Sequence, residues 1–337
     1  MATIEDVAKL AEVSTRSVSR YISGVSVRAE TARRIDEAAK QLEFYPSAAA
    51  RTLKGQSPGI ISLITDNLTT TPWSFDIIKG VQEACDQHGK LLLIGETRNN
   101  PHMFDKLVTQ FRQYKTEAII KAAYFHRPVQ VTQQFEFCPL VLVNCFDTNS
   151  KYPCILPDDE QGAYDLTNRL VSLGHEKIAF ITLPEDLIAT KLRLKGYKRA
   201  LQSNNLKLDQ SLIFTPESLG RRELSEWHLS ILKTLVSLNE PPTAIMCGKD
   251  TSASNIIMHL KELGIRVPQD ISVVGFDNYK VIAENCVPPI TTVSLPYYEM
   301  GQRAAKMAIG LADKSIKDPK SERCRCEIIP RESDKER

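Results

Sequence analysis

The 337-residue chain lacks any run of about 20 apolar residues, the length that a helix needs to cross a bilayer. Its N-terminus is too polar for a secretory signal. The eight cysteines follow no spacing typical of a disulfide-stapled domain, and several stand in apolar runs, where a reduced thiol behaves as a small hydrophobic side chain. These absences predict a cytoplasmic protein with no membrane partner.

Motifs of catalysis and of metal binding are also scarce. No glycine-rich phosphate loop follows the first predicted strand, and no nucleophile elbow or suitably spaced carboxylate pair with a histidine occurs. Cys324 and Cys326 form a Cys-x-Cys pair that could bind metal or sense redox state, but no further Cys or His at ligand spacing completes a site. Their alternation instead indicates a strand with both cysteines on one face. We expect no catalysis, no cofactor and no metal.

Net charge says little about partners, because 43 basic and 41 acidic residues leave a formal charge of +2. Any binding of nucleic acid must therefore come from where the basic residues stand. The length exceeds what one hydrophobic core usually serves. We expect a small N-terminal unit followed by a body of two lobes.

The N-terminal segment predicts two short helices separated by a tight turn. Its apolar residues recur at helical spacing and are Ile4, Val7, Ala8, Ala11, Val18 and Ile22. Ser14 is placed to cap the second helix, and a third helix over residues 30–42 would complete the core. Opposite Val18, the second helix carries hydroxyls and guanidiniums suited to base edges and phosphates. An ordinary three-helix surface unit with solvated arginines is the alternative.

A second DNA-binding feature is predicted just after this unit. Pro46 ends the third helix, Ser47 can cap a new one, and residues 48–54 have high helix propensity over barely two turns. A helix this short is largely unfolded in water, where about 12–15 residues are needed for marginal stability. Leu53 beside Lys54 suits a helix ordered in a DNA minor groove, with the leucine wedged between base steps.

From residue 57 onward, short apolar runs alternate with helical patterns. Strands are predicted over residues 60–65, 90–95, 118–121, 140–144, 178–182, 244–247 and 271–276. Helices are predicted over residues 75–88, 103–114, 161–173, 191–203, 223–237 and 251–263. This alternation is typical of parallel β-α-β units, and it predicts two sheets joined near Pro157.

Ligands of open parallel sheets bind beyond the carboxyl ends of the strands. The polar residues at these positions are Asp66, Asn144, Lys249, Asp250 and Asp277, with Lys121 at a further predicted strand end. The two later aspartates could instead cap the helices that follow them. Because a cation in a partly dry cleft favours an anion, the lysines raise the hypothesis of a ligand with a phosphate or carboxylate.

The N-terminal run, the Pro-Ser-Ala-Ala-Ala-Arg-Thr-Leu-Lys segment at residues 46–54 and the segments at 189–196 and 276–278 resemble the LacI/GalR family of bacterial transcription regulators. The resemblance extends over essentially the whole chain. It implies an all-α helix-turn-helix headpiece with a hinge helix, followed by an α/β periplasmic-binding-protein-like body of two doubly wound parallel-sheet lobes.

The domain boundaries follow from this division. We expect the DNA-binding headpiece at residues 1–46, the hinge at 47–57 and the effector-binding and dimerisation body at 58–337. Within the body, the N-lobe is expected at about 58–157 and 290–318, and the C-lobe at about 158–289 and 319–330.

Together with the patterns above, the resemblance indicates roles for individual residues. Contacts to DNA are expected from Thr3, Thr15, Arg16, Ser17, Ser19, Arg20, Arg28, Ala50, Leu53 and Lys54. Contacts to the effector are expected from Asp66, Trp73, Phe75, Asn144, Arg193, Lys249, Asp250 and Asp277. Trp73 and Phe75 could instead pack at the hinge between the lobes.

Three positions depart from the family pattern. Lys249-Asp250 stands where the family usually has Asn-Asp, and Asn144 stands where several sugar-binding members have Asp, so the cleft is more positive. Arg28 replaces a small capping residue and is expected to contact phosphate.

The sequence thus predicts a homodimeric, sequence-specific regulator, a repressor of transcription without catalysis. Its partners would be double-stranded operator DNA, with half-sites about 34–36 Å apart, and an effector that is a sugar, sugar phosphate or sugar acid. The charged segment at 330–337 has no apolar heptads, which argues against a tetramerising coil. A solute-binding protein and an enzyme on the same α/β body are the alternatives, and whether the effector induces or corepresses stays open.

Overall fold

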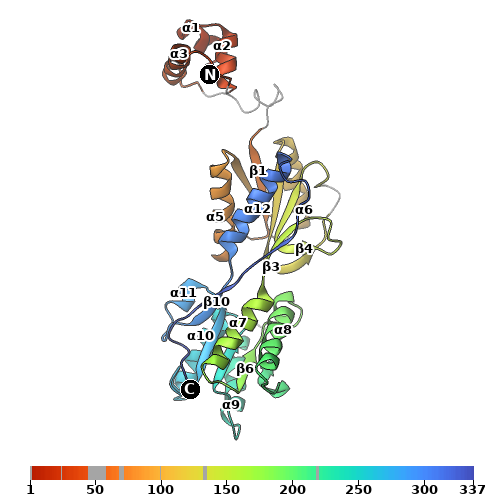
Figure 1. The fold of residues 1–337 in the computed structure, drawn as a ribbon, viewed down its shortest axis with the longest axis vertical. Helices are drawn as coiled ribbons and strands as arrows, with labels where there is room; N and C mark the ends of the chain where they lie inside the picture. Colours follow the sequence, from red (N-terminus) through yellow and green to blue (C-terminus); the bar gives the residue numbers. More distant parts are fainter. Residues whose placement is uncertain are drawn as a thin grey trace.

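The computed structural model describes residues 2–23, 25–44, 58–67, 72–98, 100–131, 135–217 and 220–337, apart from the side chains of residues 72–74, 101 and 221. The predicted hinge over residues 47–57, with Ala50, Leu53 and Lys54, lies outside the described residues. Figure 1 shows the three parts of the chain that are described below.

The headpiece contains three helices, α1 (Ile4–Leu10), α2 (Thr15–Ile22) and α3 (Ala29–Gln41). They enclose a small core in which Val7, Val18 and Ile35 are almost completely buried. The Arg34 guanidinium also ties α3 to the turn after α1, because it pairs with the Glu12 carboxylate at 3.1 Å. The structure confirms the predicted helix pair and the third helix that completes their core.

The first lobe of the body, the N-lobe, is built on a parallel sheet in the order β11-β5-β4-β3-β1-β2. Its strands are β1 (Ile60–Thr65), β2 (Leu91–Glu96), β3 (Ala118–Val129), β4 (Leu140–Asp147), β5 (Cys154–Pro157) and β11 (Glu322–Cys324). Helices α5 (Pro72–Gln87) and α12 (Tyr297–Ala312) pack together over one face. Helix α6 (Pro101–Gln113) packs on the opposite face.

The second lobe, the C-lobe, repeats the plan with the order β12-β10-β9-β8-β6-β7. Its strands are β6 (Ile178–Ile181), β7 (Ile213–Phe214), β8 (Ala244–Cys247), β9 (Ser272–Asp277), β10 (Thr291–Ser294) and β12 (Glu327–Ile329), of which β12 runs antiparallel to β10. Helices α7 (Asp159–Ser172) and α8 (Ile188–Ser203) cover one face, and α9 (Arg221–Val236) and α10 (Asp250–Glu262) the other. The short helices are η2 (Gln210–Leu212) and α11 (Lys280–Ala283).

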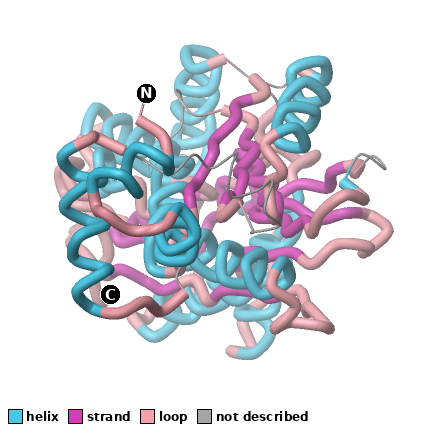
Figure 2. The backbone as a smooth tube through the Cα atoms, turned by 90° about the horizontal axis from the view of Figure 1, so that it is seen from above, coloured by secondary structure: helices cyan, strands magenta, loops and turns pink. Residues whose placement is uncertain are grey.

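Both faces of each sheet are covered, which explains the continuous apolar runs of the strands. In β6, for example, Phe180 packs on the side of α7 and α8, while Ile181 packs on the side of α9 and α10. Figure 2 shows helices lying largely outside the strands. The structure confirms the prediction of two doubly wound lobes.

The chain crosses between the lobes three times, and two crossings differ from their predicted positions. The prediction places residues 290–318 in the N-lobe, but β10 pairs with β9 and the crossing comes only at Leu295. Likewise, β11 pairs with β5 in the N-lobe, so the return occurs at Arg325 rather than near residue 319. The short strands before these two crossings, β10 and β11, belong to the sheet that the chain then leaves, and their brevity hides them in the sequence.

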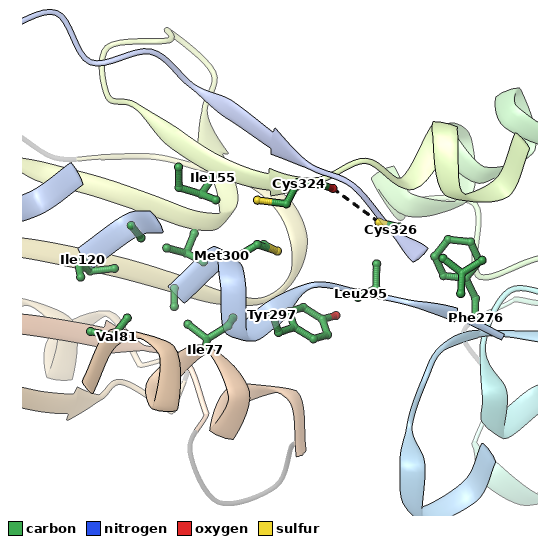
Figure 3. Packing of buried hydrophobic residues seen from close by; sticks show 14 of the residues in the cluster. Ile77, Val81, Ile120, Ile155, Phe276, Leu295, Tyr297, Met300, Cys324 and Cys326 are labelled. Carbon is green, nitrogen blue, oxygen red and sulfur yellow. Dashed lines mark hydrogen bonds between the residues drawn. The ribbon is translucent and has the colours of Figure 1, made fainter. Parts of the chain in front are cut away.

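The last crossing also corrects the prediction for the two cysteines. Cys324 ends β11 in one sheet, and Cys326 precedes β12 in the other, so they do not share one strand. Both thiols are buried against the crossing segments, near Tyr297 of α12, as Figure 3 shows. Burial raises the pKa of Cys324 to about 11, so this thiol is protonated and packs as a small apolar group.

The charged C-terminal segment is partly buried rather than solvated along its length. Asp334 accepts hydrogen bonds from the Thr291 hydroxyl and, at 2.7 Å, from Arg169 Nε. Ser333 Oγ donates to the carbonyl oxygen of Val273 at 2.5 Å. The segment therefore closes the edge of the C-lobe. In the described part of the chain, no helix has both the length and the apolar character of a membrane span.

Candidate functional sites

The outward face of α2 is the first candidate site. Ser14 caps the helix, as predicted, because its hydroxyl accepts a hydrogen bond from the Ser17 amide at 3.1 Å. With Val18 turned into the core, Thr15, Arg16 and Arg20 are exposed. This is the arrangement that presents side chains to the edges of bases in a major groove.

The basic groups of the headpiece fall into two classes. Arg33 of α3 is held by Glu30 at 2.7 Å and by Glu37 at 2.8 Å. In contrast, Arg16 and Arg28 form no hydrogen bond or ion pair within the described residues, and Arg28 stands at the start of α3 without capping it. Among the described arginines of the headpiece, those without a carboxylate partner therefore lie on α2 and at the beginning of α3.

Two of the hydroxyls predicted to contact DNA already have local partners. Thr3 and Asp6 form a reciprocal capping box at the start of α1, and the Ser17 hydroxyl lies 2.9 Å from the Ser14 hydroxyl. Ser19 is partly buried and also has a partner. These groups shape the helix ends, so we infer that any contact they make to DNA is secondary to those of the arginines.

The second candidate site lies where the carboxyl ends of the strands of both lobes meet, and Arg193 of α8 is its centre. Arg193 is only 4% exposed. Its Nε donates to Asp159 at 2.8 Å, its Nη1 to the Gly248 carbonyl at 2.5 Å, and its Nη2 lies 3.4 Å from Asp277. The guanidinium also stacks 3.7 Å from the centre of the Phe276 ring. We call His126, Asp159, Arg193 and Asp277 the Arg193 network.

Asp159 and His126 connect this network to the N-lobe, and the sequence did not single out either residue. Asp159 opens α7 in the C-lobe, and His126 lies on β3 in the N-lobe, with Nδ1 3.1 Å from Asp159 Oδ2. Burial alone would raise the pKa of Asp159, but Arg193 and His126 hold it below its usual value. The carboxylate is therefore charged, and it joins the two lobes at a buried point.

Asp277 ends β9 and has an unusual backbone conformation, with φ at 106°. A side chain other than glycine is strained there, and such strain concentrates at ligand-binding positions. Burial raises the pKa of Asp277 to about 6, against the opposing effect of Arg193. The carboxyl can thus gain or lose a proton near neutral pH, and it faces the guanidinium that the sequence predicts to hold an effector.

Asp250 has both of its oxygens committed to the C-lobe itself. Oδ2 accepts from the Tyr279 amide and Oδ1 from the Thr292 hydroxyl, each at 2.6 Å. Burial, reinforced by Asp277, raises its pKa to about 7. These contacts favour a structural role. Asp250 is therefore less available to bind the effector than Arg193 or Asp277.

The raised pKa of Asp250 makes a prediction about stability. A carboxyl whose folded pKa exceeds its unfolded value stabilises the fold below the unfolded pKa, and this contribution is lost as the pH rises from about 4 to about 7. Between pH 5 and pH 8, we expect the free energy of unfolding of Asp250→Asn to rise by about 2 kcal/mol relative to that of the wild type. Urea unfolding at each pH measures this difference. Asp270→Asn, at an exposed carboxyl paired with Arg266, should show no such gain. Parallel pH profiles for Asp250→Asn and the wild type would contradict the assignment.

On the N-lobe side, Asp66 follows β1 as predicted and is buried. It accepts a hydrogen bond from Arg127 Nη2 at 2.5 Å. Arg127 lies on β3, which continues to Val129 through an irregularity after Ala122, whereas the sequence predicts a strand that ends at Lys121. Lys121 is therefore in mid-strand, with its ammonium 4.6 Å from the Phe104 ring centre. This corrects its placement at a strand end.

The other predicted effector contacts differ in how they are placed. Asn144 is buried, with φ at 55°, and donates to the Ala123 carbonyl at 3.2 Å. Phe75 on α5 is 60% exposed, which argues against hinge packing. Trp73 lies in the first turn of α5, and its side chain is outside the described part.

One cavity borders the meeting point of the lobes, and a second lies within the C-lobe. The first, of 350 Å³, is lined by His126, Phe146 and Leu192, among others, beside the crossing strand β11. The second, of 380 Å³, lies in the C-lobe and includes Lys249. Within the described ranges, no group of His, Cys, Asp and Glu could hold a metal ion.

One arrangement outside the cleft resembles a catalytic triad. Ser225 Oγ lies 2.9 Å from His259 Nε2, and His259 Nδ1 lies 3.1 Å from Glu262 Oε2. Ser225 stands within α9, where backbone amides are used by the helix itself and cannot form an oxyanion hole beside it. The three residues therefore join α9 to α10.

Comparison with known proteins gives consistent matches along the chain. Residues 3–47 match the family described as bacterial regulatory proteins, lacI family, and residues 167–333 match a periplasmic binding protein-like domain. The HTH-type transcriptional repressor PurR of Vibrio atlanticus is 31% identical over 333 residues, or 98% of this chain and 96% of that protein. The HTH-type transcriptional repressor CytR of Escherichia coli is 28% identical over 335 residues, with the same coverage.

A solved structure supports the same architecture. The lac repressor dimer bound to operator and the anti-inducer ONPF matches with a TM-score of 0.80 and 22% identity, over 98% of each chain. At that identity, the likeness establishes the fold alone.

Proposed function

Since this chain belongs to the LacI family of bacterial regulatory proteins, we propose that its headpiece binds operator DNA as one half of a homodimer, under the control of a sugar or sugar derivative bound between the lobes. The chain is a DNA-binding transcriptional repressor and not an enzyme. We propose that it acts in the bacterial cytoplasm, where operator DNA is found. The solute-binding and enzymatic alternatives receive no support from the relatives.

The observation that carries the effector site is the buried Arg193 network. A guanidinium and carboxylates that converge beside a cleft are suited to ligand hydroxyls, because a hydroxyl can donate to the acid and accept from the arginine. Asp66 and Arg127 supply the same pair of groups from the N-lobe. A hydroxyl-rich ligand that contacts both pairs would hold the lobes in one relative position.

The contact between His126 and Asp159 connects effector binding at Arg193 to the N-lobe. Because these two residues join β3 to the start of α7, a ligand at Arg193 changes the electrostatic environment of this buried contact between the lobes. We propose that the resulting lobe movement changes the spacing of the two headpieces in the dimer. Linkage then requires that the effector and the operator alter each other's affinity by the same factor.

Arg16, one of the two exposed arginines of α2, provides a test of the DNA-binding face. We expect Arg16→Ala to relax the sequence preference in a selection from random duplexes and to cost about 1–3 kcal/mol at the preferred site. Arg33→Ala is the matched control, since Arg33 is held by two glutamates on α3. If both variants select the wild-type sequence with wild-type affinity, α2 is not the reading helix.

A further inference from the structure

The C-lobe cavity of 380 Å³ has features that the proposed sugar site does not require. Thr182, Leu183 and Pro216, which follow strands β6 and β7, line one side, and Lys249 and Ser252 at the start of α10 line another. Lys249 directly follows Gly248, whose carbonyl accepts from Arg193. Lys249 also interacts electrostatically with Asp277, so this end of the cavity lies near the Arg193 network.

Two hydrogen-bond donors in this cavity have no partner in the described structure. The Lys249 ammonium forms no hydrogen bond or ion pair, although the residue is partly buried, and the Ser252 hydroxyl is also unused. Burial lowers the pKa of Lys249, with Asp277 acting against that shift. A partly desolvated ammonium without a partner is costly, and an anion that reached it would remove that cost.

The start of α10 adds to this preference. Lys249 is its N-cap and makes no side-chain cap, while the Asp250 carboxyl is turned away toward Tyr279 and Thr292. Gly275 makes that orientation possible, because a Cβ at this position would collide with Asp250 Oδ1. The N-terminal end of this 13-residue helix thus has no side-chain cap.

His228 of α9, which interacts electrostatically with Lys249, supplies no opposing charge. His228 is fully buried, and neither of its ring nitrogens has a partner among the described residues. Burial and then Lys249 lower its pKa to about 4, so the ring is neutral. Glu217 is the acidic residue that lines the cavity, and it is exposed at the rim.

We propose that the effector is an anion, a sugar derivative whose phosphate or carboxylate binds in the C-lobe cavity to Lys249 and Ser252. This inference rests on the proposed function, since the hydroxyls of the same molecule would meet Arg193 and Asp277. It assigns Lys249 as the residue that selects charged effectors over neutral sugars.

The first experiment uses inorganic phosphate as the probe on the full-length protein. Thermal unfolding is followed at neutral pH in phosphate and in chloride at equal ionic strength. We expect phosphate to stabilise the wild type and Lys280→Gln, a control at an exposed lysine of α11. In Lys249→Gln, phosphate binding should weaken about tenfold or more, the effect of losing one charged hydrogen bond. Equal stabilisation of Lys249→Gln and wild type, or none in the wild type, would overturn the proposal.

The second experiment separates the charged group from the rest of the ligand. Matched sets of neutral sugars, sugar phosphates and sugar acids are titrated against wild type, Lys249→Gln and Glu217→Gln. Charged members should bind the wild type most tightly, lose affinity in Lys249→Gln and gain affinity in Glu217→Gln, because Glu217 repels an anion at the rim. A preference for the phosphates or for the acids identifies the group.

The failure of this inference can be told apart from failure of the proposed function. If only neutral sugars bind and they still change operator affinity, the anionic effector is wrong and the proposed function stands. If the protein shows no preference among duplexes, the proposed function itself fails, whatever the phosphate measurement shows.

Discussion

Arg193→Met is expected to abolish the response of operator binding to the effector while leaving DNA binding intact. The change also leaves Asp159 as a buried carboxylate without its main partner, which should cost about 3–5 kcal/mol of folding free energy. Urea unfolding measures the stability, and a gel-shift titration with and without effector measures the response.

Two further variants separate these effects. Asp159→Asn combined with Arg193→Met removes the orphaned charge, so stability should partly recover while the response stays absent. Arg199→Met, on the same helix, removes a partly exposed pair with Glu160, which keeps Lys195 as a second partner, and should cost about 1 kcal/mol with a normal response. A full response in Arg193→Met would show that the effector binds elsewhere.

Deletion of residues 1–57 is expected to eliminate sequence-specific DNA binding and to leave effector binding unchanged. The headpiece has a core of its own, separate from the hydrophobic clusters of the body, so the body should keep its fold. Fluorescence anisotropy with the selected duplex measures the loss, and calorimetry with the effector provides the control. Specific binding of that duplex by the truncated chain would place the DNA site in the body.

The headpiece is predictable from sequence because its interactions are local. The cap at Ser14 and the apolar spacing around Val18 act within one or two turns, and the structure contains both features. The lobes are predictable for a similar reason, since each buried strand is a short apolar run bounded by turns.

The interlobe site is less predictable, because it depends on contacts between distant segments. The sequence predicts a strand that ends at Lys121, yet β3 continues to Val129 and brings His126 to Asp159. Neither residue stands in a motif, so no sequence signal pairs them. The position of Arg193 after a strand-end loop is the local signal that could be used, and its partners follow only from the fold.

The most direct test of the account is an operator titration with the full-length protein. A duplex is selected from random DNA, and its affinity is measured by anisotropy with and without a small molecule found by thermal shift, for the wild type and Arg193→Met. The account predicts a sequence-preferring complex whose affinity changes by about fivefold or more with the ligand in the wild type only. No preference for any duplex at low or moderate ionic strength, liganded or not, would contradict it.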